Sequence, residues 1–60
     1  MTQEDEALLL ACLILGIETA PNLRELAAFW TDNQKNLGLL SERGKALAIL
    51  AKDARKPRLA

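Results

Sequence analysis

The side chain with the most reactive chemistry in this chain is the thiol of Cys12. The 60 residues include one cysteine and no histidine. A single thiol cannot form a disulfide within the chain, and without histidine it cannot complete the usual zinc ligand set. Catalysis at neutral pH usually needs a histidine, an activated nucleophile or a bound cofactor, and the sequence has no glycine-rich phosphate loop. The sequence therefore predicts a protein that is not an enzyme and that holds no metal or cofactor.

Cys12 lies in an apolar run from Ala7 to Ile17. A thiol in such a run is expected to be buried and inert, or to lie at a contact near a dimer axis. As a helix the run would extend about 16 Å, roughly half the thickness of a bilayer core. The acidic residues Glu4, Asp5 and Glu6 precede it, whereas a secretory signal begins with basic residues. We therefore expect a cytoplasmic protein with no membrane segment.

Basic residues concentrate at the other end of the chain. Residues 43–60 carry Arg43, Lys45, Lys52, Arg55, Lys56 and Arg58 against one acid. Clustered basic residues can bind phosphate, but cations are also favoured at the carboxyl end of a helix. The formal net charge is zero, so long-range attraction to nucleic acid is absent. The basic group thus leaves three alternatives: a solvated helix end, a nucleic-acid contact, or docking on an acidic protein.

Phe29 and Trp30 are the only aromatic residues, and they are adjacent. Neighbouring positions on a helix point about 100° apart, so one ring is expected in the core and the other at an edge. Exposed Trp and Phe side chains often anchor binding partners. The predicted partner-binding residues are Phe29, Trp30, Arg43, Lys52, Arg55 and Lys56.

Three helices are predicted to position these side chains, over about residues 3–18, 23–37 and 42–55. Thr2, Asn22 and Ser41 are the expected amino-terminal caps. Pro21 separates the first two helices, and Pro57 is expected to stop the third. Gly38 either marks the end of the second helix or lies within one longer helix, because a single glycine in a helix costs only about 1 kcal/mol.

Asn33 falls on the apolar side of the second predicted helix. It is expected to lie at the end of the bundle, to bond to a loop carbonyl, or to fix the register of paired helices. The short connections imply antiparallel neighbours. The predicted fold is therefore an all-α, two- or three-helix up-down bundle forming one domain over residues 1–60.

The first predicted helix is apolar around its whole circumference, which two neighbouring helices cannot cover. Large apolar surfaces on small proteins usually mark protein contacts, and a two-fold homodimer is the commonest cover. The predicted self-association residues are Leu9, Leu10, Cys12, Leu13 and Ile17. The acidic start and the basic end of the chain would lie at opposite poles of the bundle, so an antiparallel dimer is expected to bring unlike charges together.

The second half of the chain resembles small helical phage-encoded host-interaction proteins of the quorum-sensing anti-activator type. The residues that carry this resemblance are Leu23, Leu26, Phe29, Trp30, Asn33, Leu37, Leu40, Arg55 and Lys56. The resemblance covers residues 23–56, and residues 1–22 contribute nothing to it. It implies a homodimeric inhibitor that blocks a host protein by occupancy. The alternative function is a small DNA-binding regulator that uses the basic end of the third helix.

Overall fold

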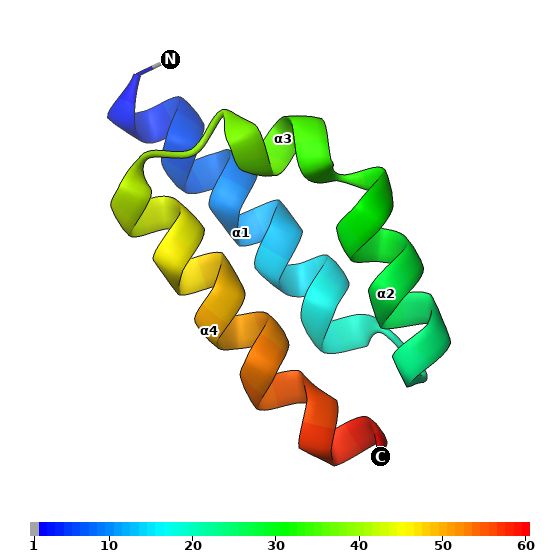
Figure 1. Ribbon diagram of the computed structural model, residues 1–60. Helices are drawn as coiled ribbons and strands as arrows, with labels where there is room; N and C mark the ends of the chain where they lie inside the picture. Colours follow the sequence, from blue (N-terminus) through cyan, green and yellow to red (C-terminus); the bar gives the residue numbers. More distant parts are fainter. Residues whose placement is uncertain (1) are drawn as a thin grey trace.

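The computed structural model describes residues 2–60, which form an all-α bundle of four helices (Figure 1). The helices are α1 (Gln3–Thr19), α2 (Leu23–Asp32), α3 (Gln34–Gly38) and α4 (Glu42–Leu59). The long helices α1 and α4 run side by side in the same direction, and α2 and α3 return along one side of them (Figure 1). The bundle measures 35 × 18 × 16 Å. Among the described residues, no helix is long and apolar enough to cross a membrane.

The three predicted amino-terminal caps are confirmed. The side-chain oxygens of Thr2, Asn22 and Ser41 accept hydrogen bonds from backbone N–H groups three residues later, at 3.1, 2.8 and 3.3 Å. Each cap satisfies a donor that the first turn of a helix leaves unpaired, which fixes where the helix begins.

The second predicted helix is divided at Asn33. The Asn33 side chain donates to the carbonyl oxygen of Phe29 at 2.8 Å, and its backbone N–H donates to the same oxygen at 3.1 Å. The Asn36 side chain then donates to Asn33 Oδ1 at 3.1 Å. These local bonds compete with the regular helical ladder and end α2, so that α3 starts in a new direction. The Asn33 amide thus bonds to a carbonyl of its own helix and not to the loop carbonyl that the sequence suggested.

The prediction that Pro57 stops the last helix is wrong, because α4 continues to Leu59. Pro57 removes its own N–H donor and its ring crowds the carbonyl one turn earlier, but the following turn remains closed by a 3.2 Å bond from Ala60 N–H to the Lys56 carbonyl oxygen. Leu59 also packs against the cluster of Ile17, Ala20 and Leu26. This apolar contact favours continuation of the helix beyond the proline.

The core consists of two adjoining clusters along the inward side of α1. Leu13, Leu37, Leu40 and Ala48 form one cluster, and Ile17, Ala20 and Leu26 form the other. Phe29 and Trp30 pack against both clusters. A Cβ atom at Gly16 would overlap the Phe29 ring, so this glycine allows α2 to approach α1 closely.

Two polar contacts hold α1 and α4 in parallel register. Near the amino-terminal ends, Ser41 donates to Glu6 Oε1 from its hydroxyl at 2.6 Å and from its backbone N–H at 3.2 Å. At the other end, Arg55 Nη2 donates to the Ala20 carbonyl oxygen at 2.8 Å. Both contacts join residues 35 positions apart. Equal separation at the two ends means that the helices stay in step along their length.

Candidate functional site

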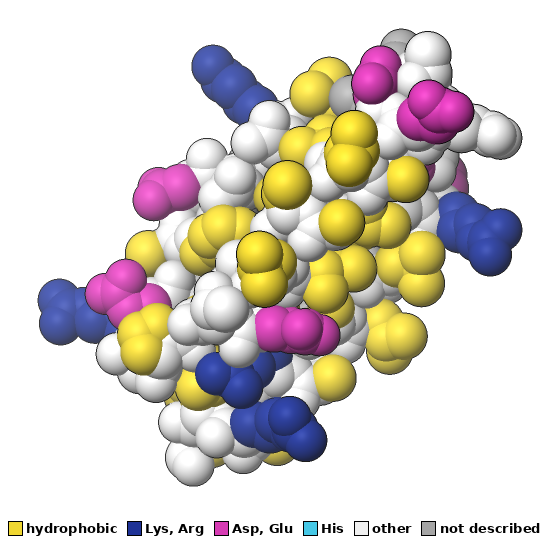
Figure 2. All heavy atoms as spheres, turned by 180° about the vertical axis from the view of Figure 1, so that it is seen from behind, with side chains coloured by type: hydrophobic (Ala, Val, Ile, Leu, Met, Phe, Trp, Pro, Cys, Tyr) yellow, Lys and Arg dark blue, Asp and Glu magenta, His cyan; other side chains and the backbone are white. Residues whose placement is uncertain are grey.

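An uncovered apolar surface lies on the outer sides of α1 and α4, away from the core. Leu8 and Leu15 of α1 are 67% and 62% exposed, and Leu47 and Leu50 of α4 are 42% and 66% exposed. Figure 2 shows hydrophobic side chains gathered along this side, with charged side chains near its ends. Contiguous exposed apolar surface of this kind is typical of a protein contact.

Each of the two helices contributes one exposed row of five residues to this surface. The α1 row is Glu4, Leu8, Ala11, Leu15 and Glu18, and the α4 row is Arg43, Leu47, Leu50, Ala54 and Arg58. Steps of three or four residues keep each row on one side of its helix. Two shallow hollows lie between the helices: Ala7, Leu10 and Leu47 are among the residues that line one, and Glu18 and Ala54 are among those that line the other. We call the two rows together the α1–α4 face.

The structure corrects part of the predicted self-association set. Leu13 and Ile17 are 3% and 0% exposed, because they point inward and fill the core of their own chain. Leu9 and Leu10 are half-buried and pack against that core. Cys12 is exposed, in contrast to the buried filler that the apolar run predicts. The exposed leucines of α1 are instead Leu8 and Leu15, which lie on the outward side of the same helix.

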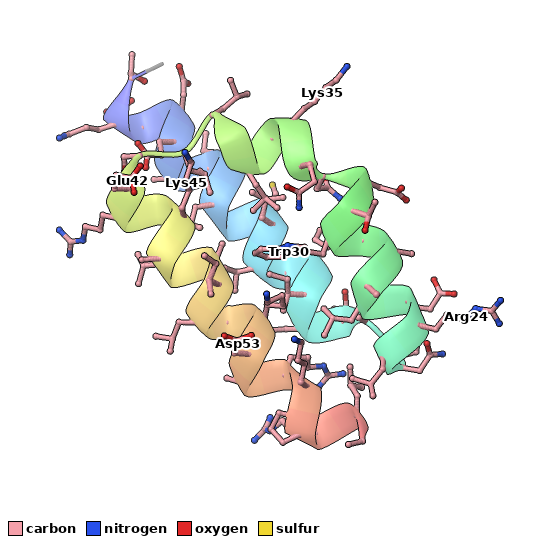
Figure 3. All side chains as sticks on the ribbon, in the orientation of Figure 1. Arg24, Trp30, Lys35, Glu42, Lys45 and Asp53 are labelled. Atoms are coloured by element: carbon pink, nitrogen blue, oxygen red, sulfur yellow. The ribbon has the colours of Figure 1, made fainter. Side chains whose placement is uncertain are left out.

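A second candidate site is the hollow beside Trp30, between the α2–α3 arm and α4. Its volume is about 280 Å³, and its lining residues are Trp30, Gln34, Leu37, Gly38, Lys45 and Ile49. Figure 3 shows Trp30 lying between the arm and α4, whereas Arg24 and Lys35 point away from the bundle. Lys52 Nζ lies 4.4 Å from the centroid of the Trp30 ring, a cation–π contact. The indole ring of Trp30 is half-buried, and Lys52 contacts one of its faces.

The structure brings Trp30 and Lys52 of the predicted partner-binding set together, but it does not gather the six residues at one place. Phe29 and Trp30 are both half-buried, with the Phe29 ring against Gly16, so the expected division into one core ring and one edge ring is not seen. Arg43 lies near the start of α4, whereas Arg55 and Lys56 lie near its end. The six predicted residues therefore occupy the core, the Trp30 hollow and both ends of α4.

Much of the basic group is engaged within the chain. Arg55 bonds to the Ala20 carbonyl oxygen, and its Nε is buried without a hydrogen-bond partner. Lys52 and Lys56 lie 3.6 and 3.8 Å from the same Asp53 carboxylate. These contacts favour the interpretation of a helix end whose basic side chains are paired within the chain, because a paired side chain is less available to bind phosphate.

Glu6 is the titratable group with the clearest structural role. The hydroxyl and then the backbone N–H of Ser41 donate to its carboxylate, and they hold the pKa of Glu6 below its ordinary value of 4.5. A Cβ atom on Gly44 would lie only 2.6 Å from Glu6 Oε1, so the glycine makes room for the carboxylate. This link was not predicted from the sequence, although Glu6 and Ser41 each lie near a predicted helix start.

Among residues 2–60, no three His, Cys, Asp or Glu side chains form a group that could hold a metal ion. The exposed leucine positions could have been found from the sequence only by knowing which side of α1 packs inward.

Comparison of the chain with protein-family models, curated proteins and solved structures gives no match.

Proposed function

We propose that this chain is a non-enzymatic protein–protein interaction module that forms a homodimer through its α1–α4 face. The observation that carries the proposal is the group of four leucines, Leu8, Leu15, Leu47 and Leu50, which are 42–67% exposed on one side of the bundle. Burying this surface against the same surface of a second copy stabilises the association, because a two-fold contact buries each of the four leucines in both protomers.

The expected energy makes the proposal testable with single substitutions. Complete burial of a leucine side chain contributes about 1.5–3 kcal/mol. Replacing Leu50 by Gln removes this contribution from both protomers of a two-fold dimer. We therefore expect Leu50→Gln to raise the dissociation constant about a hundredfold or more, since each 1.4 kcal/mol is a factor of about ten.

Sedimentation equilibrium tests this proposal with a matched pair of variants. The wild-type chain is expected to approach twice its mass of 6.6 kDa at micromolar concentration, and Leu50→Gln is expected to remain a monomer. Ile49→Gln is the control, because Ile49 is 44% exposed but lines the Trp30 hollow on another side of α4. A wild-type chain that stays monomeric, or equal effects of the two substitutions, would contradict the proposal.

A dimer formed through the α1–α4 face would leave the Trp30 hollow accessible in both protomers. The resemblance to phage-encoded inhibitors supports a role in which the dimer occupies a surface of another protein without chemistry of its own. The hollow combines apolar lining with Lys45 at its edge, which suits an apolar side chain next to an acidic group. Trp30→Ala is expected to weaken such an interaction while leaving the dimer intact.

The alternative function, a DNA-binding regulator, has less support from the contacts of α4. Arg55 is held by the Ala20 carbonyl oxygen, Lys52 by Trp30 and Asp53, and Lys56 shares the Asp53 carboxylate, so the positive charge available to a phosphate at that helix end is reduced. Retention on a heparin column at physiological salt, lost in Lys56→Glu, would favour this alternative over the interaction module.

A further inference from the structure

The α1–α4 face carries a charge pattern that distinguishes its two helices. The α1 row begins and ends with acids, Glu4 and Glu18, whereas the α4 row begins and ends with bases, Arg43 and Arg58. Between these ends both rows are apolar. From this pattern we infer that the occupant of the face is a second copy related by a two-fold axis parallel to the helices, so that α1 of each protomer packs against the partner's α4. The inference rests on the proposed homodimer.

The geometry of a face-to-face dimer allows two simple arrangements of parallel rows. If the two-fold axis runs along the helices, α1 faces the partner's α4 and points in the same direction. If the axis runs across the helices, α1 faces the partner's α1 in the opposite direction, and α4 faces the partner's α4. The first arrangement opposes acids to bases at both ends of the face. The second opposes Glu4 to the partner's Glu18, and two like charges repel.

The register of the bundle places each base of the α4 row within about one and a half helical turns of an acid of the α1 row. Within one chain, residues 35 positions apart on α1 and α4 lie close together at both ends of the bundle. A two-fold axis along the helices keeps the same heights between protomers. Arg43 of the partner then lies four residues, about 6 Å, further along the helix axis than Glu4, and the partner's Arg58 lies five residues, about 7.5 Å, further along than Glu18. The long side chains of arginine and glutamate can span these offsets.

The apolar residues between the charged ends also fit this arrangement. At the same heights, Ala11 comes beside Leu47 and Leu50 of the partner, and Leu15 comes beside the partner's Leu50 and Ala54. The small side chain of Ala11 is thereby opposed to the partner's Leu47, and Leu15 meets the partner's Leu50 at its own height, so apolar side chains face one another along the middle of both rows. Packing α1 on the partner's α1 would instead place Ala11 opposite Ala11.

This inference replaces the antiparallel arrangement expected from the sequence. That expectation assigned one net charge to each end of the bundle: negative at the start of the first helix and positive at the end of the last. On the α1–α4 face the local pattern differs, because Arg43 lies at the acidic pole and Glu18 at the basic pole. At contact distance the local pattern governs, since screening weakens charge interactions beyond about 10 Å.

Disulfide trapping distinguishes the two arrangements. In a Cys12→Ser background, Ala11→Cys and Leu47→Cys are prepared as separate proteins, and one of them carries a tag that changes its mass. Both are oxidised mildly, alone and as a mixture. Because a disulfide needs Cα atoms within about 7 Å, we expect a covalent dimer of the two different proteins in the mixture and little product from either alone.

Efficient self-linking of Ala11→Cys alone would overturn the inference, because it would place α1 against the partner's α1. The absence of a mixed product in a sample that sedimentation shows to be dimeric would overturn it as well. In both cases the homodimer itself would stand. A monomeric chain in sedimentation would instead reject the proposed function, so the two failures are distinguishable.

A charge substitution gives an independent readout of the same arrangement. Glu4→Arg places like charges beside the partner's Arg43, and we expect the dissociation constant to rise about threefold to tenfold at low salt. Adding Arg43→Glu to this variant restores the unlike pairs and is expected to return the dissociation constant to within about twofold of wild type. In the opposite arrangement Glu4→Arg would face the partner's Glu18 and strengthen the dimer, a result that would contradict the inference.

Discussion

The inward and outward sides of α1 have nearly the same apolar composition but different surroundings. On the inward side Leu13 and Ile17 are enclosed by the other helices, whereas on the outward side Leu8 and Leu15 remain exposed. The difference arises because the chain places all three other helices along part of α1 and nothing on the rest. An apolar helix in so short a chain therefore has one side that stabilises the fold and another that is available for association.

The largest contrast is expected between two substitutions to Asp on opposite sides of α1. Leu13→Asp puts a charge into the core and is expected to unfold the chain, because a buried unpaired charge costs several kcal/mol. Leu15→Asp puts the charge on the α1–α4 face, so the monomer is expected to stay helical and lose only association. Circular dichroism with sedimentation measures both effects, and a folded Leu13→Asp variant would show that the two sides are not distinct.

A smaller contrast is expected between two helical glycines. Gly16→Ala forces the Phe29 ring away from α1 and is expected to destabilise the fold by about 1–3 kcal/mol, as overpacking does. Gly38 has open space around its Cβ position and no positive φ, so Gly38→Ala is expected to stabilise α3 by up to about 1 kcal/mol. Urea denaturation measures the two values. A neutral Gly16→Ala would mean that α2 does not approach α1 closely.

The smallest expected effect is the pH dependence that Glu6 adds to the inward side of α1. Because Ser41 lowers the pKa of Glu6 in the folded chain, the bond stabilises the fold above the ordinary pKa of 4.5 and loses this effect as the pH falls below it. Thermal unfolding of Glu6→Gln is therefore expected to show a weaker loss of stability on acidification than wild type. Glu25→Gln is the control, since Glu25 lies exposed in the first turn of α2. Identical acid profiles for wild type and Glu6→Gln would refute the link.

Features set by local sequence were predicted well. The caps at Thr2, Asn22 and Ser41 each depend on a side chain and a backbone group only three residues apart. The all-α fold follows from these starts and from the spacing of the apolar residues. The parallel course of the first and last long helices follows from the short connections between elements.

Features that depend on tertiary contacts were not predicted. The local sequence at Pro57 predicts the end of a helix. Leu59 nevertheless packs against an apolar cluster that residues of α1 and α2 help to form, and this contact depends on the tertiary structure. Cys12 and Leu13 are adjacent in an unbroken apolar run, and only packing decides that Leu13 is buried and Cys12 exposed. The predicted self-association set for this reason included Leu13 and Ile17, which the fold buries in its own core.

Small-angle X-ray scattering over a concentration series tests most directly whether the α1–α4 face is covered by a second copy. The single chain has a Cα radius of gyration of 11.1 Å. We expect wild type to rise clearly above this value with concentration, and Leu15→Asp to stay close to it while remaining helical. A wild-type radius that stays near 11.1 Å up to high micromolar concentration would contradict the account.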